Sequence, residues 1–174
     1  MKIGIDLGTT NSVAAVDDGR PHIILTSMNE RYMPSVVSWH KDRYLIGRPA
    51  LNNAVLAPEE TIFSIKRLMG LSIDDSKVKE VSESKRFAYR ITRAEQSDDG
   101  GVRVVIDGKL HTPQEISAKI LEQVVKDANK ALNSKMTHAV ITVPAYFSEP
   151  QRPATREAGE KAGFDFFAGR IGLE

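Results

Sequence analysis

The sequence predicts an α/β fold in which helices flank a mixed sheet. Three features predict it: short apolar runs separated by turn residues near the N-terminus, one long amphipathic helix after residue 112, and a β-rich segment at residues 138–143 that Pro144 ends. The 174 residues suffice for one domain or two small subdomains, because a chain of about 150 residues can bury roughly 68–70% of its unfolded surface.

The first 25 residues predict an antiparallel meander. Apolar runs at residues 2–7, 12–16 and 22–25 are separated by the turn Gly8-Thr9-Thr10-Asn11 and by a second turn that contains Asp18-Gly19. Asp-Gly between two such runs is a strong hairpin signal. Three adjacent strands are therefore expected here.

The next 80 residues predict smaller elements. Further short strands are expected at residues 33–39 and 44–46, and helices at 49–57 and 59–69, the second capped by Gly70. Residues 71–100 are the least apolar stretch and predict a surface excursion. Alternation of apolar and polar residues predicts half-buried strands at 87–91 and 102–106, and a turn at Asp107-Gly108 leads into a short strand at 109–111.

The last third predicts two helices around a strand. Thr112 as N-cap, Pro113 in the first turn and Glu115 three residues after the cap mark the start of a long helix. Its apolar stripe is a core face. The strand at 138–143 is expected beside that at 3–7, and a helix from Ser148 to Ala162 should follow it.

Composition excludes several classes of function. The formal net charge of +1 argues against a binder of polyanions, and a nucleic-acid partner would need a local basic patch. The chain has no cysteine, so disulfides and cysteine-ligated metal sites are excluded. The isolated histidines share no ligand spacing; they are His22, His40, His111 and His138. An acidic residue at position 6 leaves no room for a signal peptide, so no membrane association and a cytoplasmic location are expected.

The segment IDLGTTNS, residues 5–12, is the first candidate for chemistry. A glycine turn between strands lets backbone amides approach an anion, and Thr9 and Thr10 add hydroxyl donors, so phosphate is the natural ligand. Asp6 beside the turn could hold magnesium, usually through water. A hairpin with a capped turn and no ligand explains the same residues equally well. Gly108-Lys109 is no P-loop, because Leu110 stands where Ser or Thr is required.

Two further motifs carry basic residues. Lys66 lies in IKRLMG, where a lysine on a helix is usually solvated. Arg152 lies in the first turn of the helix that follows VPAYF, where its charge opposes the helix dipole. Another group should therefore hold Arg152.

Five motifs in register resemble the DnaK-type heat-shock chaperones of the seventy-kilodalton class, whose ATPase domain is actin-like, with a ribonuclease H-like fold. They are IDLGTTNS, SIKRLMG, TPQEIS, AVITVPAYF and QRxATxEAG. The resemblance runs from Met1 to about Gly163 and covers the first of the two lobes of that domain. It implies a core formed by residues 1–30 and 109–174, with residues 31–108 inserted as a small α+β subdomain.

The resemblance also implies residue roles. Gly8, Thr9, Thr10 and Asn11 would wrap the β- and γ-phosphates of ATP or ADP, with Asp6 near Mg²⁺. Lys66 would position the attacking water and the γ-phosphate. Pro144 and Arg152 match a relay that reports nucleotide state to a peptide-binding domain.

Departures from the family pattern limit what is carried over. Residues 166–174 do not follow the pattern without a gap, so the family's catalytic glutamate is not assigned to Glu174. Pro153 stands at a position where the family helix has a non-proline residue, which can displace Arg152.

The resemblance implies the ATP-binding lobe of a chaperone that couples ATP hydrolysis to binding and release of unfolded polypeptide, helped by a J-domain protein and a nucleotide-exchange factor. A single lobe is expected to show little or no turnover. The alternative is a non-catalytic truncated paralogue or structural domain that binds nucleotide weakly or not at all. A small-molecule kinase is disfavoured, because VPAYF and IKRLMG are not expected in sugar kinases.

The end of the chain is unusually apolar. Three of the four residues at 164–167 are phenylalanines. This tail and the broad apolar stripe of the long helix predict exposed apolar area and self-association through residues 164–167.

Overall fold

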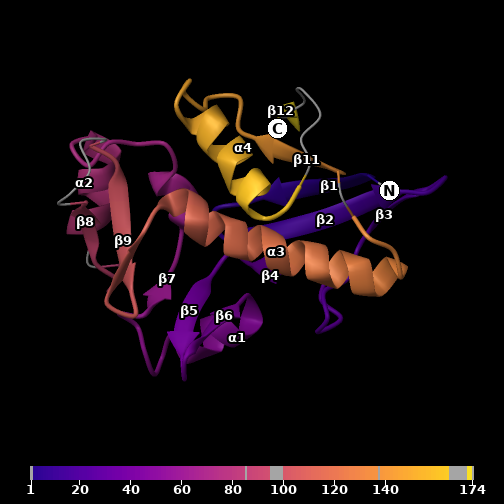
Figure 1. Cartoon of the computed structure of the whole chain (residues 1–174), viewed down its shortest axis with the longest axis horizontal. Helices are drawn as coiled ribbons and strands as arrows, with labels where there is room; N and C mark the ends of the chain where they lie inside the picture. The colour runs from indigo at the N-terminus through magenta and orange to yellow at the C-terminus, as the bar shows by residue number, and fades with distance from the viewer. Residues whose placement is uncertain (1, 85, 95–99, 137, 165–171, 174) are drawn as a thin grey trace.

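The computed structural model describes residues 2–84, 86–94, 100–136, 138–164 and 172–173. Within them, a six-stranded mixed sheet carries two helices against one face (Figure 1). Its strands are β1 (Lys2–Leu7), β2 (Asn11–Asp17), β3 (Pro21–Ile23), β4 (Met33–Pro34), β11 (His138–Val143) and β12 (Gly172–Leu173). Their order is β12, β11, β1, β2, β3, and β4 pairs with the start of β2.

The N-terminal meander and its parallel neighbour are as the sequence predicts. β2 pairs antiparallel with both β1 and β3. β11 pairs parallel with β1, and Ile5 lies opposite Ile141. Alternate residues of β1 are buried, which places Ile3, Ile5 and Leu7 in the core.

Helix α3 (Pro113–Leu132) crosses the sheet and begins at the predicted capping box (Figure 1). The Glu115 amide donates to the Thr112 hydroxyl at 3.1 Å, and the Thr112 amide donates to the Glu115 carboxylate at 3.0 Å. Ile116 and Ile120 are fully buried. The expectation that this helix leaves its apolar stripe exposed is wrong, because the stripe packs inside its own chain.

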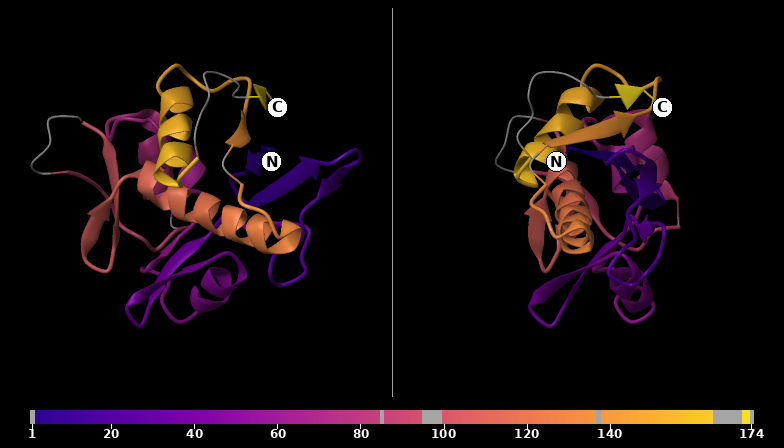
Figure 2. Two further views of the ribbon diagram at one scale, coloured as in Figure 1. Left: turned by 45° about the vertical axis from the view of Figure 1, so that its right-hand side comes forward. Right: turned by 90° about the vertical axis from the view of Figure 1, so that its right-hand side faces the viewer.

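Helix α4 (Gln151–Lys161) packs beside α3 and against β11 (Figure 2). It begins later than predicted, with Pro150 as N-cap. The Ser148 hydroxyl and amide both contact the Gln151 side-chain oxygen, at 3.2 and 3.1 Å. The Ser148 hydroxyl therefore binds a side chain of the first turn, and the Ser148 carbonyl accepts the Gln151 amide at 3.1 Å.

Two three-stranded sheets, two α-helices and a 3₁₀ helix complete the described part of the chain. One sheet has the order β6, β5, β7, and the other has the order β10, β9, β8. The elements are β5 (Val37–His40), β6 (Arg43–Ile46), α1 (Arg48–Asn53), β7 (Thr61–Ile62), α2 (Ser76–Glu83), β8 (Ile91–Arg93), β9 (Val102–Ile106) and β10 (Lys109–His111).

Two predictions for residues 33–69 are wrong. The predicted strand at 33–39 is divided between two sheets, because Pro34 ends β4 and β5 begins at Val37. The predicted helix at 59–69 is instead β7 followed by a 3₁₀ helix, η1 (Ile65–Leu68). Pairing of β7 with β5 outweighs helix formation here, since it buries Ile62 opposite Val37. The helix predicted at 49–57 also ends early, at Asn53.

The excursion at 71–100 contains a helix that the sequence analysis missed. Asp75 caps α2 by accepting the Lys77 amide at 2.8 Å, and Val78 and Val81 are buried beneath it. The strand predicted at 87–91 is wrong, since β8 starts only at Ile91. Phe87 and Tyr89 pack as an aromatic pair with ring centroids 5.7 Å apart.

Of the apolar tail at residues 164–167, the structure describes only Phe164. Phe164 is 4% exposed, and its amide donates to the Gly159 carbonyl at 3.1 Å, so it belongs to the core of its own chain. It offers no exposed surface for self-association. The part of that expectation that concerns Phe166 and Phe167 lies outside the described residues.

Thr112→Ala is expected to lower the free energy of unfolding by about 1 kcal/mol, because the capping box loses its hydroxyl acceptor. Urea denaturation followed by circular dichroism measures the loss. The control is Ser82→Ala, an exposed position in α2 that caps nothing. Equal stabilities of the two variants would contradict the assigned capping role.

Candidate functional site

The turn between β1 and β2 has a shape fixed by its neighbours. A Cβ atom on Gly8 would lie 2.0 Å from the carbonyl oxygen of Asn11, so only glycine fits there. The Ser35 amide donates to the Thr10 carbonyl at 2.8 Å, and the hydroxyls of Ser35 and Ser12 are 2.9 Å apart. The turn is thus tied to the chain beside β4, while Thr10 and Asn11 remain exposed.

Asp6 and the loop at Pro144 lie at the same end of the sheet as this turn. β1 and β11 are parallel, with Asp6 opposite Thr142, so the segments that follow them leave from one edge. The Thr142 hydroxyl donates to the Asp6 carboxylate at 3.2 Å. The predicted position of the 138–143 strand beside the 3–7 strand is confirmed, and it puts Thr9 and Pro144 at one end of the sheet.

Lys66 is buried, unlike a typical surface lysine. It lies in η1 and is 6% exposed. Its ammonium is 5.4 Å from the centroid of the Phe147 ring, within the range of a cation–π interaction. Ser64, with a left-handed φ of 53°, turns the chain from β7 into η1. The position of Lys66 therefore depends on a short, specific turn.

The segment that carries Lys66 lies directly against α4. Gly70 has a φ of 66°, and a Cβ atom there would be 2.5 Å from the Pro150 carbonyl oxygen and 2.9 Å from Gln151 Cα. Only glycine allows this approach, because it satisfies both the backbone angle and the space.

Arg152 binds the loop that precedes α4. Its Nε donates to the Phe147 carbonyl and a terminal nitrogen donates to the Ala145 carbonyl, both at 3.3 Å. The Phe147 amide closes the loop onto the Pro144 carbonyl at 3.0 Å. The expectation that another group holds Arg152 is confirmed. Pro153 lies in the first turn of α4, where its missing amide removes no hydrogen bond within the helix.

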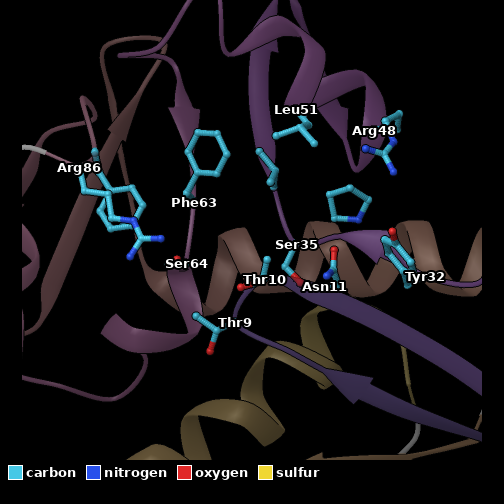
Figure 3. A pocket seen from close by; sticks show the side chains of 13 residues that line it. Thr9, Thr10, Asn11, Tyr32, Ser35, Arg48, Leu51, Phe63, Ser64 and Arg86 are labelled. Carbon is cyan, nitrogen blue, oxygen red and sulfur yellow. The ribbon is translucent and has the colours of Figure 1, made fainter.

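Two cavities meet at Thr9. The larger, about 440 Å³, also involves Thr10, Asn11, Ser64 and Arg86 (Figure 3). Its other lining residues are Tyr32, Pro34, Ser35, Val36, Arg48, Leu51, Phe63 and Phe87. The smaller, about 330 Å³, is lined by Thr9, Lys66, Arg67, Lys77, Glu80, Val81, Tyr146, Phe147 and Gln151.

The structure thus brings some predicted site residues together and leaves others apart. Thr9 shares one cavity with Lys66 and the other with Thr10 and Asn11. Within the described part of the chain, neither cavity is lined by Asp6, Gly8, Pro144 or Arg152. Asp6 and Gly8 adjoin the turn along the chain, and Pro144 and Arg152 contact the site through Phe147.

Aromatic residues form a wall that sequence reasoning did not assign to the site. The Tyr89 hydroxyl donates to the Phe63 carbonyl at 2.8 Å. Burial raises the pKa of Tyr89 well above its usual value, so this donor stays protonated. Phe63 stacks on Phe87 at 6.3 Å between centroids. The apolar alternation at 87–91 was the available signal, but it was interpreted as a strand.

The described residues contain neither a cluster of metal ligands nor a membrane-spanning helix. No group of three or more His, Cys, Asp or Glu side chains gathers there in a way that could hold a metal ion. No helix within the described ranges is both long and apolar enough to cross a bilayer.

The mixed sheet, its strand-turn-strand motif at residues 2–17 and the flanking helices define an actin-like ATPase fold. The family model described as "Hsp70 protein" matches residues 2–171. The chain belongs to the Hsp70 family, which binds nucleotide.

Relatives are similar along nearly the whole chain. "Chaperone protein DnaK" of Thermus thermophilus is 51% identical over 164 residues, which cover 94% of this chain and 26% of that protein. DnaK of Deinococcus radiodurans is 44% identical, with 94% and 25% covered. The "Stromal 70 kDa heat shock-related protein, chloroplastic" of Pisum sativum is 47% identical, with 94% and 23% covered. The chain spans about a quarter of the length of these relatives.

Gly8→Ala is expected to destabilise the protein by about 2 kcal/mol or more, because the new Cβ would overlap the Asn11 carbonyl. Gly4→Ala on the preceding strand, β1, is the control, since its Cβ would meet nothing closer than the Ala15 carbonyl at 3.8 Å. Urea denaturation of both variants makes the comparison. A Gly8→Ala protein as stable as the control would show that the turn can rearrange.

Arg152→Met is expected to loosen the 144–147 loop, because two carbonyls lose their donor. Hydrogen exchange at the Phe147 amide should become several-fold faster. The control is Lys161→Met on the same helix, which removes only a surface pair with Glu157. Unchanged exchange in Arg152→Met would mean that the loop is held by other contacts.

Proposed function

We propose that this chain forms the N-terminal ATP-binding lobe of a DnaK-type chaperone. The observation that carries the proposal is the position of Thr9: the turn that only Gly8 allows places it between a cavity with Lys66 and a cavity with Thr10 and Asn11. In this proposal residues 1–30 and 109–174 form the core of the lobe, and residues 31–108 form the smaller subdomain.

The turn Gly8-Thr9-Thr10-Asn11 binds the β- and γ-phosphates of ATP or ADP. The absence of a Cβ at Gly8 gives the phosphates access to backbone amides. Thr9 lines both cavities and Thr10 lines the larger one, and their hydroxyls supply further donors. Such fixed donors need little reorganisation when charge develops during phosphoryl transfer.

Lys66 and Asp6 act on either side of the turn. The Lys66 ammonium borders the cavity that also contains Thr9, so it positions the attacking water and the γ-phosphate. Asp6 is exposed beside the turn and fits a magnesium ion held through water. Bound Mg²⁺ would neutralise phosphate charge. Thr142 orients the Asp6 carboxylate by its hydrogen bond.

Pro144 and Arg152 transmit the state of the site. Phe147 contacts the Lys66 ammonium through its ring and Arg152 through its carbonyl. Any movement of Lys66 on nucleotide binding therefore meets a residue held by α4. The same proposal includes unfolded polypeptide, a J-domain protein and a nucleotide-exchange factor as partners, and a cytoplasmic location; one relative is named as chloroplastic.

The 174-residue chain is expected to bind ATP weakly and to turn it over little or not at all, because the resemblance assigns half of the phosphate contacts and all base contacts to a second lobe. Nuclear magnetic resonance measures binding as shifts of the Gly8, Thr9 and Thr10 amides on addition of ATP, with the distant Gly108 amide as control. Absence of any shift would favour the non-catalytic alternative.

A steady-state ATPase assay tests the second half of this prediction. The wild-type rate should equal the background without protein, and Lys66→Ala should have the same rate. Hydrolysis above background that Lys66→Ala abolishes would show that one lobe suffices for catalysis.

A further inference from the structure

The larger cavity has a cationic lining. Its charged lining residues, within the described chain, are Arg48 and Arg86, and no Asp or Glu joins them. Arg48 is already neutralised, since it donates to one Glu30 oxygen from two nitrogens, at 2.8 and 3.0 Å. In the described ranges, no carboxylate forms an ion pair with Arg86. Among the described residues, the cavity therefore has one positive charge, that of Arg86, with no carboxylate paired to it.

Arg86 is held on an aromatic platform. Its guanidinium carbon is 5.9 Å from the centroid of the Phe87 ring, and Phe87 stacks on Phe63. Figure 3 shows the guanidinium turned into the cavity toward Ser64, with Thr9 and Thr10 along the same cavity. Phe63 is itself fixed by the Tyr89 hydroxyl. This stacking limits how far the side chain must reorganise to meet a ligand.

The hydrogen-bond donors at the two ends of the cavity, Arg86 and the threonines of the turn, favour a phosphate ligand. A guanidinium binds phosphate with parallel hydrogen bonds, more specifically than an ammonium does. At the other end, the turn offers threonine hydroxyls. A phosphate group between them would meet donors on both sides and no carboxylate in the described lining.

We propose that Arg86 binds a phosphate group above the Gly8–Asn11 turn, and that this group is either the terminal phosphate of bound ATP or a free phosphate ion. The inference rests on the proposed function and adds a specificity residue to it. Arg86 would make the site prefer ATP to ADP in the first case, and would retain phosphate beside ADP in the second.

The test compares Arg86→Gln with Arg90→Gln, whose arginine is exposed and lies outside the lining of both cavities. Calorimetric titrations at fixed magnesium use ATP, ADP, and inorganic phosphate with ADP present. Arg86→Gln should weaken ATP binding roughly tenfold, the effect of one charge-assisted hydrogen bond, and leave ADP binding almost unchanged. Arg90→Gln should alter neither. Arg86→Lys, which keeps the charge, should be intermediate.

The outcomes separate the two phosphate sources. A loss confined to ATP indicates the terminal phosphate, whereas Arg86-dependent binding of inorganic phosphate indicates the free ion. Wild-type affinities for ATP and phosphate in Arg86→Gln, or equal losses for ATP and ADP, would overturn this inference alone. Wild-type protein that binds none of the three probes would overturn the proposed function together with it.

Discussion

The parallel pairing of β1 with β11 is the constraint on which the site depends. Ile5 and Ile141 lie opposite each other and are each 1% exposed. A slip of one residue would turn such side chains to the other face, so burial fixes the register. That register places Asp6 beside Thr142 and makes the Gly8–Asn11 turn and the Pro144 loop leave from the same edge of the sheet.

A second constraint is the burial of a charged lysine. An ammonium removed from water requires compensating contacts, and the Phe147 ring supplies one of them to Lys66. Phe147 is in turn held by Arg152, and Gly70 allows the Lys66 segment to lie against the start of α4. The site is thus connected through direct contacts to Arg152 of α4, a residue that lines neither cavity. This is the physical basis on which a relay is proposed.

Patterns of neighbouring residues correctly predicted the elements that are stabilised by contacts within a few residues of the chain. The capping box at Thr112 requires only the next three residues, and the structure has it as predicted. The meander follows from alternation and turn residues. The position of Arg152 near a helix start was enough to predict that another group holds it, and two carbonyls do so. Local reasoning failed at residues 59–69, where the apolar spacing suits a helix but the β5 edge was available for pairing.

The sequence alone determined the turn at Gly8–Asn11, the long helix, the β11 strand and the family, because each depends on residue types at short, fixed spacings. Only the tertiary structure decided that Lys66 is buried beside Phe147 and that Arg86 lines the cavity above the turn. Lys66 lies 81 residues before Phe147 in the chain, and Arg86 lies 77 residues after Thr9. Such contacts arise when separate elements bury their apolar faces together, and no local pattern around either residue encodes which partner it will meet.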